Sequence, residues 1–84
     1  MALAFPNQSR SYDENGRRVR FTGHDGMFEV MFFVRADALS NPAAGEASYL
    51  AAFDAARETI YDKARKIYLK GRKAVYVLSA ADFA

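Results

Sequence analysis

The chain has 84 residues, enough for one domain with one hydrophobic core, and its composition, 51% hydrophobic with seven Phe and five Tyr, argues against disorder. The absence of cysteine excludes disulfides, thiolate metal ligands and thiol nucleophiles, and it fits a reducing cytosol without establishing the compartment. The expected location is cytoplasmic, because Met1–Pro6 lacks the basic start and the long apolar stretch of a signal peptide and no membrane span is predicted. The net charge of +2 does not by itself predict a nucleic-acid partner, and no apolar run approaches the roughly 18 residues of a membrane span, so no membrane partner is expected.

The first predicted element is a β-hairpin that turns at Asn15-Gly16. This dipeptide is preferred in type I′ turns, which need positive φ at both central residues. Folding about the turn sets Asp13 opposite Arg18 and Tyr12 opposite Val19, so that the facing charges are opposite in sign and the facing apolar residues match.

A second tight turn is predicted within Gly23–Gly26, and it leads into Met27–Val34, a strand that is apolar on both faces. Because strand side chains alternate between faces, one side of the resulting sheet is almost purely apolar. That side carries Val19, Phe21, Phe28, Val30, Phe32 and Val34. The other side mixes arginine, methionine and an aromatic ring, is interrupted by Glu29, and is the candidate interaction surface: Arg18, Arg20, Met31 and Phe33.

Ala36–Leu39 fits a single helical turn, after which Asn41 and Pro42 have the residue types of an N-cap and a first helical residue. Gly45 weakens that start, so one long amphipathic helix is expected from about Glu46, with Gly71 following its basic last turn. Its apolar stripe comprises Tyr49, Phe53, Ala56, Ile60, Ala64 and Ile67, flanked by Leu50 and Tyr68.

The β-branched and aromatic segment Ala74–Leu78 predicts a C-terminal strand, and the helix before it permits a crossover that would pair this strand parallel to an earlier one. Ser79 and Asp82 have the spacing of a capping box, which predicts a terminal helical turn ending at Phe83. The predicted fold is therefore a single α+β domain over residues 1–84: an antiparallel three-stranded meander, one long amphipathic helix and one C-terminal strand joining the sheet.

One helix can cover only one side of such a sheet, so the side with Met31 and Phe33 needs another cover. Two candidates are the N-terminal segment, through Leu3 and Phe5, and a second copy of the chain. The leading functional hypothesis is a small non-enzymatic interaction or accessory module that binds either itself or an unidentified protein partner through this side.

Arginines interleaved with aromatic residues on a sheet also suit single-stranded nucleic acid, which uses backbone contacts and base stacking. The alternative hypothesis is weak nucleic-acid binding through Arg18, Arg20 and Phe33. A basic patch at the end of the helix would add phosphate contacts, although such a run is more often a solvated helix end that complements the macrodipole. The patch comprises Lys63, Lys66, Lys70, Arg72 and Lys73.

His24 and Asp25 are the only pair that suggests acid–base chemistry, and their expected place in a tight turn favours a solvated turn over a catalytic role. One His without Cys cannot supply a typical zinc site, and no phosphate-binding glycine motif is present. No catalytic, cofactor-binding or metal-binding residue is therefore assigned, and no cofactor is expected.

Arg57 falls inside the apolar stripe of the helix. Its stem can pack there while its head reaches water or a nearby carboxylate. The alternative is a structural ion pair with Asp82 that would organise the helix against the last strand.

Five segments, Leu3–Asn7, Val19–Gly26, Phe32–Leu39, Phe53–Arg57 and Tyr76–Phe83, together resemble an uncharacterised family of short bacterial proteins catalogued as domain of unknown function 1488. The resemblance implies a compact α+β bacterial domain and carries over no catalytic or ligand-binding residue. Arg35 departs from the acidic residue expected in that family, which puts in doubt any surface shared with relatives.

Overall fold

A computed structural model describes residues 3–6, 8–39, 45–71 and 73–83, and the predicted Asn41 and Pro42 helix start lies outside these ranges. The mixed α+β class predicted from the sequence is confirmed. In chain order the elements are β1 (Leu3–Ala4), β2 (Arg10–Asp13), β3 (Arg18–Asp25), β4 (Phe28–Arg35), α1 (Ala36–Leu39), α2 (Glu46–Ala55), α3 (Arg57–Lys70), β5 (Val75–Leu78) and the 3-10 turn η1 (Ala80–Phe83).

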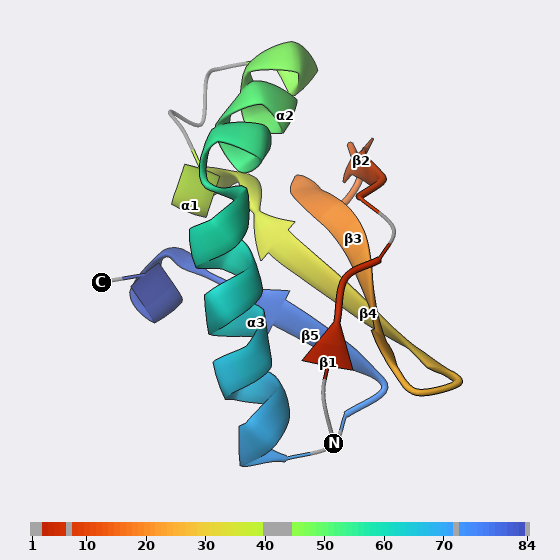
Figure 1. Cartoon of the computed structure of the whole chain (residues 1–84). Coiled ribbons are helices and arrows are strands. Elements are labelled where there is room, and N and C mark those ends of the chain that lie inside the picture. Colours follow the sequence, from red (N-terminus) through yellow and green to blue (C-terminus); the bar gives the residue numbers. More distant parts are fainter. Residues whose placement is uncertain (1–2, 7, 40–44, 72, 84) are drawn as a thin grey trace.

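The strands form one sheet in the order β1-β3-β4-β5, with β2 also paired to β3 (Figure 1). The predicted meander is β2-β3-β4, and all of its pairings are antiparallel. The final strand β5 pairs parallel to β4 after the helical crossover, as the sequence predicts. The long helical segment formed by α2 and α3 packs on one face of this sheet, and none of the described helices lies over the other face (Figure 1).

The predicted register of the first hairpin is confirmed, with Asp13 opposite Arg18. The predicted type I′ turn is wrong, because the residue with positive φ is Arg17 (φ 50°) and not Asn15 or Gly16. The Asp13 carboxylate accepts a hydrogen bond from the Gly16 N–H at 3.3 Å. Such a local side-chain bond stabilises a longer loop, here of four residues, in place of the two-residue turn.

The second turn lies one residue later than predicted, at Gly26-Met27, where Gly26 has a φ of 62°. The shift leaves the parity of the pairing unchanged, so the two faces of the sheet hold the predicted residues. Phe28 is on the helix side as expected, but it is the first residue of β4, beside the turn, and remains 74% exposed.

The single long helix predicted from Glu46 is two helices that meet at Ala56, whose φ and ψ of −106° and 14° leave the helical range. The Ala56 N–H donates to the carbonyls of both Ala52 and Phe53, at 3.1 and 3.2 Å, so the ladder of hydrogen bonds continues across the bend. The predicted apolar stripe is confirmed, since its large residues are buried or partly buried against the sheet.

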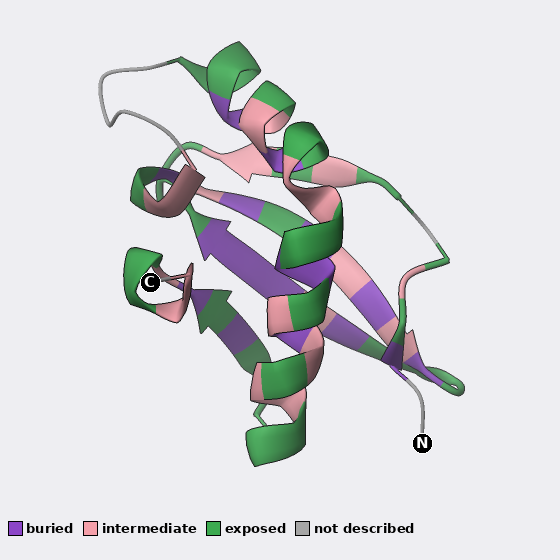
Figure 2. Ribbon diagram, turned by 60° about the vertical axis from the view of Figure 1, so that its left-hand side comes forward, coloured by how far each residue is buried: buried purple, intermediate pink, exposed green. Residues whose placement is uncertain are grey.

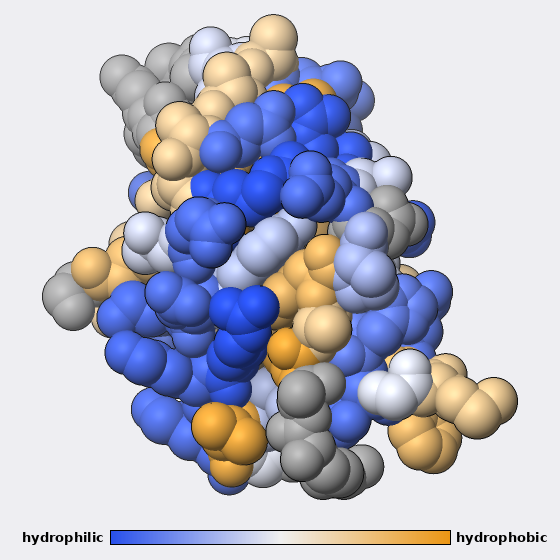
Figure 3. Space-filling view, viewed as in Figure 1, coloured by the Kyte–Doolittle hydropathy of each residue, from blue (hydrophilic) through white to orange (hydrophobic). Residues whose placement is uncertain are grey.

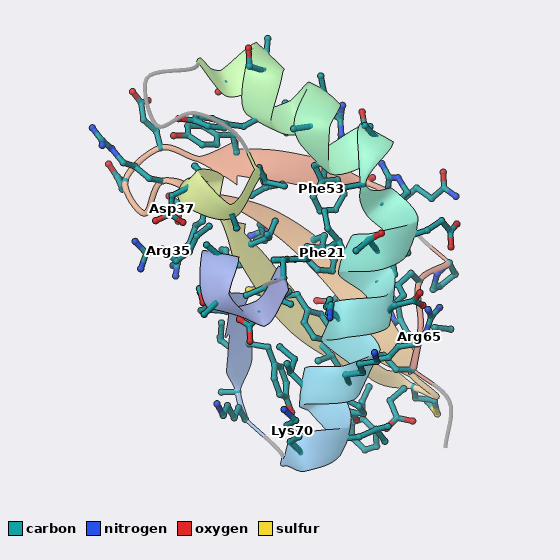
Figure 4. The ribbon with its side chains drawn as sticks, turned by 90° about the vertical axis from the view of Figure 1, so that its left-hand side faces the viewer. Phe21, Arg35, Asp37, Phe53, Arg65 and Lys70 are labelled. Atoms are coloured by element: carbon teal, nitrogen blue, oxygen red, sulfur yellow. The ribbon has the colours of Figure 1, made fainter. Side chains whose placement is uncertain are left out.

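The core fills the space between the helices and one sheet face (Figure 2). Phe53 of α2 and Phe21 of β3 point toward each other there, with ring centroids 5.2 Å apart (Figure 4). Tyr61 is also buried, with 6% exposure, although the stripe read from the sequence omits it.

The N-terminal segment packs on the helix side of the sheet, so the hypothesis that Leu3 and Phe5 cover the other side is wrong. Gly23 is the physical reason, because its missing side chain leaves room on β3: a Cβ there would lie 2.9 Å from the Phe5 ring and 3.0 Å from Leu3. Phe5 fills this room and stacks on Tyr61, with ring centroids 4.0 Å apart and planes 3° from parallel.

Two arginines of α3 hold the same segment by its backbone. Arg57 donates to the carbonyl of Gln8 at 2.9 Å, and Arg65 donates to the carbonyl of Leu3 at 3.3 Å. The Arg65 guanidinium also lies over the Phe5 ring, 5.2 Å from its centroid. The helix therefore binds the N-terminal chain through both apolar and polar contacts.

The predicted ion pair between Arg57 and Asp82 is wrong. Arg57 instead bonds to Asp54 at 2.6 Å, so its stem packs while its head reaches a nearby carboxylate. Hydrogen bonds from Arg10 first, and then from Arg57, hold the pKa of Asp54 below its ordinary value. Asp82 accepts a bond from the Ser79 N–H at 2.8 Å, which confirms the capping box and its terminal turn.

Candidate interaction surface on the sheet

The open face is the side of the sheet that points away from α2 and α3. Within the described ranges, every helix and the 3-10 turn contribute side chains to the core on the opposite side. The register lines up the open-face residues of β3, β4 and β5 in rows across the sheet. These rows are Arg18-Arg35, then Arg20-Phe33-Val77, then Thr22-Met31-Val75, then His24-Glu29.

Arg18 and Phe33, two members of the predicted surface, form a closed unit on this face. The Arg18 guanidinium lies 3.7 Å from the centroid of the Phe33 ring and leaves Phe33 only 7% exposed. Asp13 holds Arg18 in this position through a hydrogen bond of 3.0 Å, and the same bond lowers the pKa of Asp13. The positive charge of Arg18 at this end of the open face is therefore balanced by Asp13 of the same protomer.

The apolar part of the open face lies beside this unit. Val75 and Val77 of the edge strand are 39% and 45% exposed, and Met31 is partly exposed between them and β3. Both valines lie outside the surface predicted from the sequence, because no local pattern shows which strand β5 joins. Only the parallel register places them next to Met31 and Phe33.

Arg20 and Glu29 are exposed on the open face, and neither forms a hydrogen bond or ion pair with any other described residue. They line a shared hollow of about 340 Å³ whose wall also includes Ser11, Thr22 and Met31. The face thus combines apolar area with one free charge of each sign.

His24 and Asp25 do not form the acid–base pair considered from the sequence. Both belong to β3, so their side chains point to opposite faces of the sheet. His24 lies on the open face beside Glu29, whereas Asp25 is buried and accepts a hydrogen bond from the Tyr68 hydroxyl at 2.5 Å. This bond fastens the β3–β4 hairpin to the end of α3, so the solvated-turn explanation is wrong for Asp25.

Replacing Tyr68 with phenylalanine is expected to lower the free energy of unfolding by about 2 kcal/mol, because the buried Asp25 carboxylate would lose its donor. Urea denaturation followed by circular dichroism measures the change. Tyr12→Phe is the matched control, since the Tyr12 hydroxyl bonds to no described residue, and it should leave stability nearly unchanged. Equal effects of the two substitutions would contradict a stabilising role for the Tyr68–Asp25 bond.

Three lysines of the predicted basic patch, Lys63, Lys66 and Lys70, belong to α3 and so lie on the helix side of the sheet, whereas Lys73 lies in the loop before β5. Lys66, Lys70 and Lys73 are exposed, Lys63 is partly exposed, and Arg72 is outside the described residues. Lys70 marks the end of α3 in Figure 4, and the outer surface of that helix is largely hydrophilic in Figure 3. The nucleic-acid hypothesis combined the sheet residues Arg18, Arg20 and Phe33 with the basic patch. The lysines of α3 and these sheet residues lie on opposite sides of the sheet, so they do not form one continuous surface.

No group of three or more metal-ligating side chains occurs in the part of the chain that the structure describes. None of the described helices is both long enough and apolar enough to cross a bilayer.

A protein-family model described as "Protein of unknown function (DUF1488)" matches residues 3–78. The chain belongs to this family. Neither the curated proteins nor the solved structures gave a significant match. In this DUF1488 protein Arg35 lies directly opposite Arg18 across the strands and bonds to Asp37 at 3.1 Å. Each arginine of that pair thus has its own carboxylate, which offsets their mutual repulsion.

Proposed function

We propose that this protein is a small non-enzymatic interaction module that self-associates through the open face of its sheet. The observation that carries the proposal is the one-sided architecture: the described helices and the N-terminal segment all pack on one face, while Met31, Val75 and Val77 stay partly exposed on the other. Exposed apolar area on a small domain commonly marks an interaction site. The proposal places the protein in the cytoplasm, because a domain without cysteine suits a reducing compartment.

A second copy is favoured as the occupant because the exposed valines belong to the edge strand β5 and lie on the same face as Met31. Joining two copies face to face would bury both apolar areas at once, with a partner present at the same concentration as the protein itself. The neutralised Arg18–Asp13 unit would lie toward the rim of such an interface, where charged pairs are tolerated.

The mass of the protein in solution tests the proposal. Size-exclusion chromatography with light scattering at micromolar concentration is expected to give a dimer for the unmodified chain. Val77→Lys should raise the dissociation constant by about tenfold or more, because a charge would enter the apolar part of the interface.

Leu69→Lys is the matched control for Val77→Lys. Leu69 is 80% exposed on α3, away from the open face, so the same change of residue type there should leave the mass unchanged. A strict monomer at all concentrations tested for the unmodified chain would refute self-association.

Weak binding of single-stranded nucleic acid is the alternative, and the geometry favours it less. The face of the Phe33 ring, which would have to stack on a base, is already occupied by the Arg18 guanidinium. Fluorescence anisotropy with single-stranded RNA and DNA at low salt tests this alternative. Binding that strengthens steeply as salt falls would support it, since phosphate contacts release counterions.

A further inference from the structure

Two opposite charges of the open face, Arg20 and Glu29, have no partner within the described part of the protomer. We infer that they pair between two copies: Arg20 of each copy binds Glu29 of the other across a two-fold axis. This inference rests on the proposed self-association. It adds the relative orientation of the two copies, and it identifies the ion pair between Arg20 and Glu29 as the contact that makes a second copy the preferred partner.

The register supplies the geometry of this pairing. Arg20 lies beside Phe33, and Glu29 precedes Phe33 by four residues on β4. The Cα atoms of Arg20 and Glu29 are therefore about 14 Å apart on one face. Consider a two-fold axis in the interface plane that crosses the line between Arg20 and Glu29 at its midpoint and at a right angle. Rotation about this axis places Arg20 of one copy over Glu29 of the other. Each residue then faces its complement, and a two-fold interface forms both pairs at once.

The same axis also brings the apolar residues together. The midpoint between Arg20 and Glu29 falls between Thr22 and Met31, in the row that lies between the row of Arg20 and the row of Glu29. Met31 of one copy therefore lies against Met31 of the other, and the flexible methionine side chain adapts well to such a contact. In the plane of the sheet, the rotation also carries Val77 of β5 close to the position of Val75 of the other copy. A single orientation of the two copies thus pairs Arg20 with Glu29 and also brings the exposed valines of the two copies together.

The other charges of this end of the sheet do not compete for the same partners. Arg18 bonds to Asp13 at 3.0 Å, and Arg35 bonds to Asp37 at 3.1 Å. These pairs are complete within the protomer, so Arg20 is the arginine of the open face that is left for an intermolecular carboxylate.

Charge reversal with complementary mixing tests the inference. Arg20→Glu and Glu29→Arg should each raise the dissociation constant by about tenfold or more, because each would place like charges opposite one another twice. An equimolar mixture of the two variants should recover a 1:1 dimer, since every contact between unlike variants again joins opposite charges. Sedimentation velocity of the single variants and the mixture gives both results.

Lys66→Glu is the control, because it changes the net charge as Arg20→Glu does, but at an exposed position of α3. It should dimerise like the unmodified chain, and circular dichroism should show that all variants are folded. A dimeric unmodified chain whose association is unaffected by Arg20→Glu, or whose two variants fail to associate on mixing, would overturn the inference and leave self-association standing. A monomeric unmodified chain would instead refute the proposed function itself.

Discussion

Replacing Phe53 with alanine is expected to lower the free energy of unfolding by about 3–5 kcal/mol, the usual cost of removing a buried ring. Phe53 is fully buried, and its ring packs at 5.2 Å from that of Phe21, directly before the bend at Ala56. A domain of this length has a total stability of roughly 4–12 kcal/mol, so the substitution would remove a large part of it.

Urea denaturation followed by far-ultraviolet circular dichroism measures the effect of Phe53→Ala. Leu69→Ala is the control, because Leu69 is 80% exposed on α3, and its stability should change by less than about 0.5 kcal/mol. A loss below about 1 kcal/mol for Phe53→Ala would contradict the packing of α2 on the sheet described above.

The sequence predicted those parts of the fold that local pattern determines. Alternation along Met27–Val34 assigned Phe32 and Val34 to the core face, and both are fully buried. Helical spacing likewise identified Phe53 and Ile60, because the period of the apolar residues reports directly on which side of an element meets the core. The first hairpin kept its predicted register even though its turn differs, since cross-strand charge and packing determine register independently of the loop.

Contacts between distant segments were not predictable in the same way. Whether Arg57 forms its ion pair with Asp82 or with Asp54 depends on where the C-terminal end of the chain packs. In the structure Arg57 bonds to Asp54, and Asp82 accepts a hydrogen bond from Ser79 in the capping box. The open face was predicted from β3 and β4 alone, and its apolar half, Val75 and Val77, followed only from the parallel pairing of β5. No local pattern encodes which neighbour a C-terminal strand will join.

The position of the N-terminal segment depends on an absent side chain, and this dependence can be measured. Gly23→Val is expected to lower the free energy of unfolding by about 3 kcal/mol, because a Cβ at this position would already lie 2.9 Å from Phe5 and 3.0 Å from Leu3. Loss of the nuclear Overhauser contacts between the rings of Phe5 and Tyr61 would show that the segment has left β3. Gly71→Val is the control, because Gly71 has extended backbone and no atom within 4 Å of an added Cβ.

A double-mutant cycle separates this crowding from a general effect of valine on β3. Phe5→Ala removes the ring that an added side chain at Gly23 would strike, so the combination should cost at least about 1 kcal/mol less than the sum of the two single substitutions. Strict additivity would mean that Phe5 and Gly23 do not share this space. Coupling would instead establish that the Phe5 ring and a side chain at position 23 compete for the same space on the helix side of the sheet.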